Sequence, residues 1–168
     1  KDLADFAQSS PDLVVEMAHP DVTRQWGQKI VEKTNYMLVS VTARTREVGI
    51  RLAIGALARF YKIDPEAVLV VHDELDLPPV TARLKRGGGH GGHNGLRDII
   101  NHIGKDFLRL RIGIGHPGNS KQVVNYVLKN PSTQDLDKIL DANSQTLKIL
   151  PTLLDGHLEK AMQQLHTK

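Results

Sequence analysis

The sequence contains no cysteine and few aromatic residues, which make up 4% of its 168 residues. Without cysteine there is no disulfide and no thiolate chemistry, which fits a cytoplasmic protein. No run of about 18 apolar residues predicts a membrane-spanning helix, and residues 1–13 lack the apolar stretch of a signal peptide. These absences predict a globular protein of the cytoplasm that does not enter a membrane.

Acidic residues are scarce in one region of the chain. Residues 81–130 hold nine Lys or Arg against two Asp or Glu, although the whole chain has a net charge of only +3. A local excess of positive charge favours a polyanionic partner, with nucleic acid the natural candidate. A solvated basic surface without a partner is the alternative.

The length suits a single domain, residues 1–168, with a sizeable core. Apolar patterns predict strands near residues 13–15, 37–42, 67–71, 81–85 and 108–114, and helices near 46–61, 94–103, 123–128 and 135–165, the last interrupted near Pro151. This order predicts an α/β fold with a mixed, twisted sheet flanked by helices and a C-terminal helix. A monomer is the default expectation.

The most informative stretch is a glycine-rich loop that follows a buried strand. The run Ala67–Val71 is continuously apolar and leads into His72-Asp73-Glu74, and ten residues separate Asp76 from the run GGGHGGHNGL. Glycine lets backbone approach a ligand closely, and open α/β sheets bind ligands at the carboxyl ends of their strands. We therefore expect a site where this strand and this loop meet.

Two side chains of this region have the chemistry of a catalytic site. Asp73, expected directly past the strand end, can orient a histidine so that the other ring nitrogen stays free as a base. Asn94 offers both an acceptor and donors, so it is expected to cap the following helix, to hold a substrate, or to do both. A capping or loop role is the alternative for each residue.

Other site chemistries receive less support. Gly87, Gly89 and Gly92 match a G-x-G-x-x-G pattern, but the pattern follows a basic, exposed strand and no Lys-Ser/Thr comes after it, so neither a dinucleotide site nor a P-loop is indicated. His90 and His93, beside His72 and Asp73, have ligand types that zinc or manganese accept. Glycine pairs make poor scaffolds for metal ligands, so we expect a site without a metal or a cofactor.

The motifs HDELDLPP, GGGHGGHNGL and LRLRIGIGHPG, in this order and spacing, resemble the bacterial peptidyl-tRNA hydrolase family from about Phe60 onward. The resemblance implies hydrolysis of the ester between a peptide and the 3′ end of tRNA, without a metal and without an obligate protein partner. It implies that Asp73 orients a histidine, that Asn94 and Gly91 bind substrate, and that basic residues hold phosphates of the acceptor stem. By motif the phosphate-binding residues are Lys85 and Arg111. The neighbouring Arg86 is expected to contribute, and Arg97, Lys105 and Arg109 are further basic residues around the loop that could together hold phosphates.

The first third of the chain departs from the family pattern. The family's Thr-Arg-His-Asn stretch corresponds to Thr23-Arg24-Gln25-Trp26, so Gln25 stands where the resemblance implies the general base, and glutamine cannot take up a proton near neutral pH. His19 replaces a family asparagine, and Tyr36 keeps an aromatic residue of a binding segment. We expect His19, Gln25 and Tyr36 to line the substrate site.

A surrogate base is therefore needed if the protein is an esterase. The candidates are His93, which we favour and group with Asp73 and Asn94 as catalytic, and His90, His116 and His19. The alternative is a relative that binds tRNA through the same surface but has lost catalytic activity.

Overall fold

The structure is a computed structural model that describes residues 13–16, 39–40, 58–60 and 62–167. Its strands are β1 (Leu13–Glu16), β2 (Val39–Ser40), β3 (Val68–Glu74), β4 (Ala82–Arg86) and β5 (Leu108–Gly113). They form one sheet in the order β2-β1-β3-β5-β4, in which only β4 is antiparallel to its neighbour. The predicted mixed sheet is thereby confirmed.

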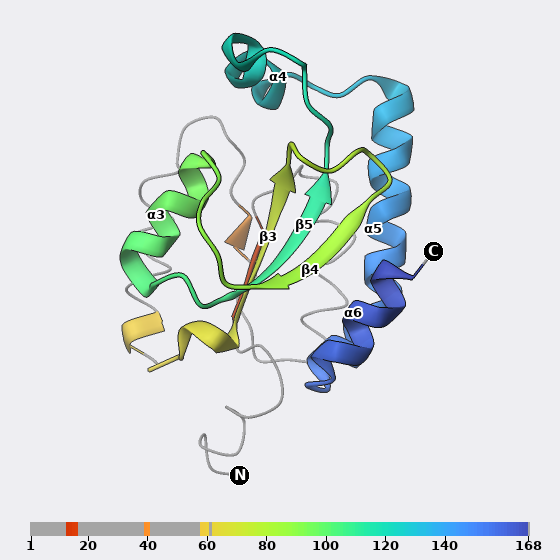
Figure 1. Cartoon of the computed structure of the whole chain (residues 1–168). Coiled ribbons are helices and arrows are strands. Elements are labelled where there is room, and N and C mark those ends of the chain that lie inside the picture. Colours follow the sequence, from red (N-terminus) through yellow and green to blue (C-terminus); the bar gives the residue numbers. More distant parts are fainter. Residues whose placement is uncertain (1–12, 17–38, 41–57, 61, 168) are drawn as a thin grey trace.

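Helices lie on both sides of this sheet (Figure 1). They are α3 (Asn94–Ile103), α4 (Val123–Leu128), α5 (Thr133–Leu154) and α6 (Leu158–His166), with short 3-10 turns at Pro65–Ala67 and Ser120–Gln122. Helix α3 covers one face, α5 and α6 cover the other, and α4 lies beyond the carboxyl ends of β3 and β5. In the described part of the chain, no helix has the length and apolar character needed to cross a membrane.

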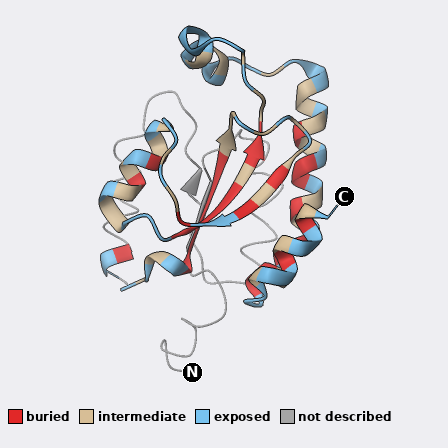
Figure 2. Ribbon diagram, in the orientation of Figure 1, coloured by how far each residue is buried: buried red, intermediate tan, exposed pale blue. Residues whose placement is uncertain are grey.

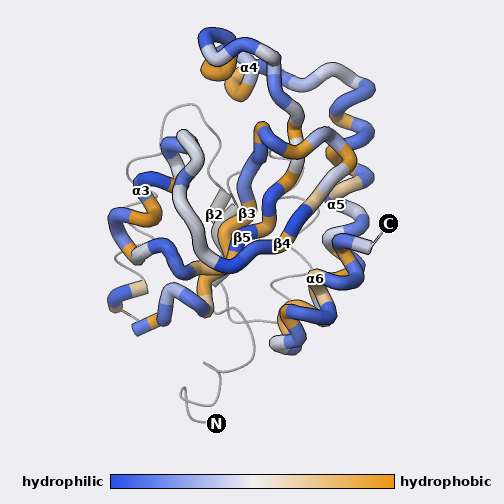
Figure 3. Tube along the Cα trace, in the orientation of Figure 1, coloured by the Kyte–Doolittle hydropathy of each residue, from blue (hydrophilic) through white to orange (hydrophobic). Residues whose placement is uncertain are grey.

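Alternation along the strands divides the apolar side chains between two core regions. Leu69 and Val71 of β3 pack with Leu110 and Ile112 of β5 against α5 and α6. Val68 and Val70 face the opposite way and pack with Leu96, Ile99 and Phe107 beneath α3. The central strands are buried and the outer helix faces are exposed (Figure 2), and hydropathy follows the same division (Figure 3). Strand β3 is covered on both faces because its apolar run is continuous.

Two boundaries differ from the sequence-based predictions. Strand β3 runs on to Glu74, so Asp73 lies within the strand and not directly past it, because pairing with β5 continues as far as Glu74 and Gly113. Helix α5 continues through Pro151 to Leu154. It ends where Gly156, with φ of 81°, takes the left-handed conformation in which helices commonly terminate.

Two further predictions need correction or lie beyond what is described. His93, and not Asn94, is the N-cap of α3, because the imidazole accepts the amide hydrogen that an asparagine would otherwise accept. The predicted helix at residues 46–61 falls mostly outside the described residues, of which 58–60 are helical.

Candidate functional site

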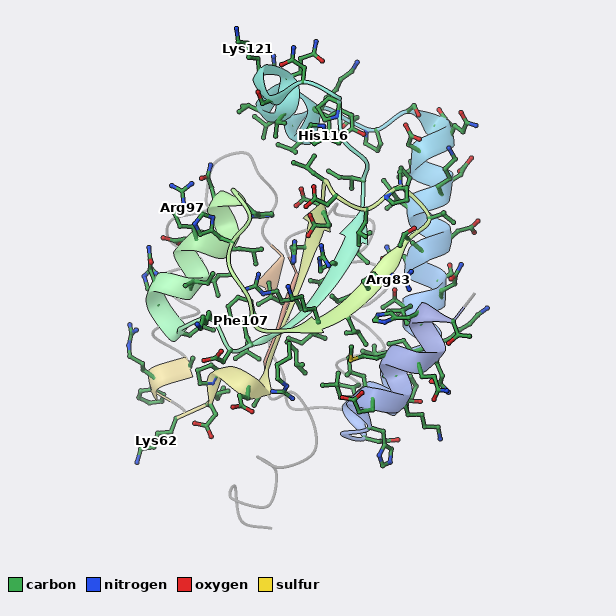
Figure 4. All side chains as sticks on the ribbon, viewed as in Figure 1. Lys62, Arg83, Arg97, Phe107, His116 and Lys121 are labelled. Atoms are coloured by element: carbon green, nitrogen blue, oxygen red, sulfur yellow. The ribbon has the colours of Figure 1, made fainter. Side chains whose placement is uncertain are left out.

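The site lies where the carboxyl end of β3 meets the glycine-rich loop and the start of α3 (Figure 4). A hydrogen bond joins Nε2 of His93 to Oδ1 of Asp73 at 3.1 Å, and both side chains are about one quarter exposed. The resemblance implied an aspartate beside a histidine at this position. The structure brings these two residues together although the loop and β4 separate them in sequence.

Both ring nitrogens of His93 are engaged. The amide N–H of Leu96 donates to Nδ1 at 3.2 Å, so Nδ1 carries no proton. The neutral ring must then carry its proton on Nε2, which donates to the Asp73 carboxylate. In this arrangement His93 presents no lone pair to a water molecule. Its geometry suits orientation of Asp73 and capping of α3 better than proton abstraction.

Asp73 is kept as a carboxylate. Burial acts to raise its pKa, but the hydrogen bond from His93, together with the electrostatic interaction with the His93 and His72 rings, outweighs burial and lowers the pKa below its ordinary value. Asp73 is therefore ionised at neutral pH and serves as a hydrogen-bond acceptor and a fixed negative charge.

His72 lies behind this pair and is 2% exposed. Its Nδ1 donates to the backbone oxygen of Asp73 at 2.7 Å, which leaves an unprotonated Nε2 without a hydrogen-bond partner among the described residues. Its ring meets the His93 ring edge to face, with centroids 5.4 Å apart and planes at 82°. Burial, reinforced by His93, lowers the pKa of His72 to about 4. His72 is therefore uncharged at neutral pH and lines the buried side of the site.

His90 and His116, the other candidate bases that the structure describes, each accept a backbone hydrogen bond at Nδ1, as His93 does. The amide of Gly92 donates to Nδ1 of His90 at 3.1 Å, and the amide of Gly118 donates to Nδ1 of His116 at 2.9 Å. In the neutral form each ring then carries its proton on Nε2. Neither histidine can accept a proton there without losing a hydrogen bond to its own loop.

Asn94 and Gly91 are both exposed beside the Asp73–His93 pair. Oδ1 of Asn94 accepts a hydrogen bond from Nη2 of Arg97 at 2.7 Å. This contact turns the Asn94 carbonyl toward a cation at the first turn of α3. Gly91 has open space where a side chain would begin, so a ligand can reach its backbone.

The predicted phosphate-binding residues have different surroundings. Lys85 is exposed, with Nζ beside Gly88. Nε of Arg111 donates to Glu74 at 2.8 Å. Burial acts to raise the pKa of Glu74, but Arg111 outweighs it and lowers that pKa. Arg86 pairs with Glu66 at 3.1 Å in solvent, and alternation along β4 directs it to the face opposite Lys85.

Some predicted site residues cannot be located, and Arg109, expected among the phosphate-holding residues, is instead buried and bonded to the loop backbone. His19, Gln25 and Tyr36 lie outside the described residues. Within the described part, no group of three or more potential ligands is placed to hold a metal. Sequence reasoning missed the engagement of both His93 nitrogens and the burial of Arg109. The position of His93 before an apolar helical stripe was the signal that could have identified its capping role.

Comparison with known proteins agrees with these observations. The family model described as peptidyl-tRNA hydrolase matches residues 14–168, and the chain belongs to this family. A peptidyl-tRNA hydrolase of Saccharophagus degradans is 61% identical over 118 residues, which cover 69% of this chain and 60% of that protein. One from Coxiella burnetii is 50% identical over 139 residues, covering 82% of this chain and 73% of that protein.

Solved structures give the same relationship. The crystal structure of peptidyl-tRNA hydrolase from Acinetobacter baumannii superposes with a TM-score of 0.78 at 31% identity, covering 96% of each chain. A complex of peptidyl-tRNA hydrolase with N-propanol gives a TM-score of 0.80 at 32% identity with the same coverage. The chain spans about three fifths of the length of several curated relatives that it matches.

Proposed function

We propose that this protein hydrolyses the ester bond between a peptide, or an N-blocked amino acid, and the 3′ end of tRNA. The Asp73–His93 contact of 3.1 Å carries the proposal, because it fixes a carboxylate and an imidazole together at the carboxyl end of a central strand. Family membership supplies the substrate class. The proposed setting is the cytoplasm, without an obligate protein partner, a metal or a cofactor.

Water attacks the ester carbonyl, and the resulting tetrahedral intermediate bears a negative charge on oxygen. Gly91 and Asn94 are accessible next to the Asp73–His93 pair, so a backbone amide and a side-chain amide are available there as donors. Such donors stabilise an oxyanion most effectively when they are fixed before the reaction begins. His93 ties the end of the loop to Asp73 and to α3, which supports a role for both residues in substrate binding.

The attacking water also needs a base. The sequence favours His93, but hydrogen bonds to both of its nitrogens argue against proton uptake there, and His90 and His116 have Nδ1 similarly engaged. His19 is the remaining candidate, since Gln25 cannot take up a proton. We propose that His19 is the base, with Asp73 as the carboxylate that orients its ring.

The tRNA acceptor stem is proposed to bind through Lys85 and Arg111. The register pairs Lys85 with Arg109 across β4 and β5, which makes Lys85 and Arg111 diagonal neighbours on one face. Diagonal neighbours in an antiparallel pair lie about 7 to 8 Å apart, a separation that one phosphate group can bridge. Alternation along β4 directs Arg86 to the face opposite Lys85, so Arg86 is proposed as a weaker and peripheral contact.

A second candidate function is tRNA binding without hydrolysis. The occupied Nδ1 atoms of three histidines, together with Gln25, favour it. The basic surface would be retained in such a protein, whereas no residue would abstract a proton from water.

Single-turnover hydrolysis of N-acetyl-aminoacyl-tRNA distinguishes the two candidates when it is combined with tRNA binding. We expect hydrolysis by the wild-type protein, a loss of roughly 10² to 10⁴-fold in Asp73→Asn and His19→Asn, and unchanged tRNA affinity in both variants. Salt-dependent binding of tRNA without hydrolysis would establish the second candidate. A wild-type protein that neither binds nor cleaves the substrate would overturn both.

A further inference from the structure

Arg109 differs from the other cations near the loop because it is buried. It lies in β5, is 4% exposed, and its guanidinium group sits 4.7 Å from the centre of the Phe107 ring. One terminal nitrogen donates to the backbone oxygen of Gly89 at 2.6 Å and the other donates to the backbone oxygen of Gly88. Arg109 therefore points into the protein, beneath the loop, and cannot also hold a phosphate in solvent.

A buried cation is costly unless its donors are satisfied. Here the two terminal nitrogens have successive backbone carbonyls as partners and the guanidinium group has an aromatic face, whereas Nε has no hydrogen-bond partner among the described residues. In the described part of the chain no carboxylate forms an ion pair with Arg109. A planar fork of donors fits two neighbouring oxygens and stacks on a ring, whereas a lysine ammonium group does neither. The site therefore has a specific requirement for arginine.

The hydrogen bonds from Arg109 hold Gly88 and Gly89, which belong to a glycine-rich segment whose backbone has many accessible conformations. Gly87 and Gly88 have φ values of 63° and 106°, a region that glycine enters readily and other residues rarely adopt. The amide of Gly87 donates to the backbone oxygen of Phe107 at 2.9 Å. Phe107 and Arg109 together therefore hold the first three residues of the loop, 87–89. At the other end His93 is tied to Asp73 and to α3.

Only residues 90–92 lie between these two anchors. Gly91, one of the proposed substrate-binding residues, is in the middle of them. The length of this span is short, so the position of the first anchor determines where the Gly91 backbone lies relative to Asp73.

We propose that Arg109 is a positioning residue, which sets the conformation of the loop and thereby the place of its substrate-binding backbone. This role rests on the proposed function for its effect on catalysis. The loop conformation itself is independent of that function, because it follows from contacts within the protein.

The test compares Arg109→Lys and Arg109→Met with the matched control Arg83→Lys. Arg83 is also a strand arginine that donates to a backbone oxygen, but that oxygen belongs to His166 at the end of α6. We expect amide hydrogen exchange of residues 88–92 to accelerate at least roughly tenfold in both Arg109 variants, about 1.4 kcal/mol of lost protection, and to stay unchanged in the control. For hydrolysis, kcat/KM should fall by about 10²-fold, the scale for a 1 Å displacement of reacting groups, with tRNA affinity retained.

A wild-type measurement keeps the proposal open to refutation if the variants do not fold. NMR of the wild-type guanidinium group should show slowly exchanging Nη protons of Arg109, and rapid exchange with solvent would overturn the proposal. Unchanged loop exchange in folded Arg109 variants would overturn it as well, as would weaker tRNA binding with a shallower salt dependence. If the wild-type protein lacks hydrolase activity, the proposed function fails while the loop measurements still decide the role of Arg109.

Discussion

Asp73 and His93 are 20 residues apart in sequence, and their side chains meet at 3.1 Å. Nδ1 of the same His93 ring accepts a hydrogen bond from the amide of Leu96, which makes His93 the N-cap of α3. One imidazole therefore links the central strand, the glycine-rich loop and the helix. Because its two nitrogens serve different partners, substitutions that imitate one nitrogen at a time separate the two roles.

His93→Asn and His93→Gln should have opposite effects. Asparagine is a favoured N-cap, so His93→Asn should keep stability close to wild type but lose the contact with Asp73 and reduce kcat/KM by about 10²-fold. Glutamine can extend a donor toward Asp73 but is a poor cap, so His93→Gln should lose about 1 kcal/mol of unfolding free energy and keep more activity. Urea unfolding and single-turnover hydrolysis measure the two effects. Equal losses of stability in both variants would remove the capping role.

The stability of the protein should depend on pH through His72. The pKa of His72 is about 4 in the folded state against an ordinary value of 6.5. As the pH falls from 6.5 to 4, the unfolded chain binds a proton at His72 that the folded protein excludes, so stability decreases. The loss attributable to this residue is about 3 kcal/mol at pH 4.

The pH measurement compares urea unfolding of wild type and His72→Asn between pH 7 and pH 4. The variant should show the shallower dependence, whatever its absolute stability. Asp73 does not obscure this window, because its lowered pKa means that its contribution is lost only below its ordinary value of 3.8. Parallel curves for the two proteins would show that His72 titrates normally or is protonated in the folded state.

Lys85→Ala and Arg111→Ala should weaken tRNA binding without changing hydrolysis of a minimal peptidyl-adenosine ester. Each lost phosphate contact should reduce the log-log salt slope by about 0.7 to 0.9. Arg86→Ala provides the comparison, and we expect a smaller effect because alternation along β4 directs Arg86 to the face opposite Lys85. Wild-type affinity and slope in the Lys85/Arg111 double variant would identify this basic surface as ordinary solvated surface.

Gly113→Ala should strongly destabilise the protein. A Cβ at this position would lie 2.2 Å from the backbone oxygen of Pro78 and 2.8 Å from that of Leu77, and neither backbone atom can rotate away. We expect a loss of about 3 kcal/mol or more, at the upper end for overpacking. Gly89→Ala is the control, since nothing lies within 4 Å of the Cβ that alanine would add there. Thermal or urea unfolding of both variants is sufficient, and similar stabilities would contradict the close approach of residues 77–78 to β5.

Much of the fold and part of the site could be predicted from local patterns. The continuous apolar run before His72 indicated a central strand, and the period-two pattern of Leu108, Leu110 and Ile112 indicated β5, because side-chain burial along a strand repeats at fixed intervals. The motif order also indicated that Asp73 and a loop histidine belong to one site. These features depend on residues that are close in sequence, or on strand ends that a parallel sheet brings to one edge.

The sequence alone determined that the glycine-rich loop, Asp73 and a basic segment accompany an α/β core. Only the tertiary structure decided which nitrogen of His93 carries the proton, that Arg111 is paired with Glu74, and that Arg109 is buried under the loop. Alternation assigns Arg109 to the polar face of β5, and nothing in that pattern reveals that the loop folds back over this face. The physical reason is that hydrogen-bond partners and burial depend on contacts between distant segments, whereas periodicity records only the environment along one element.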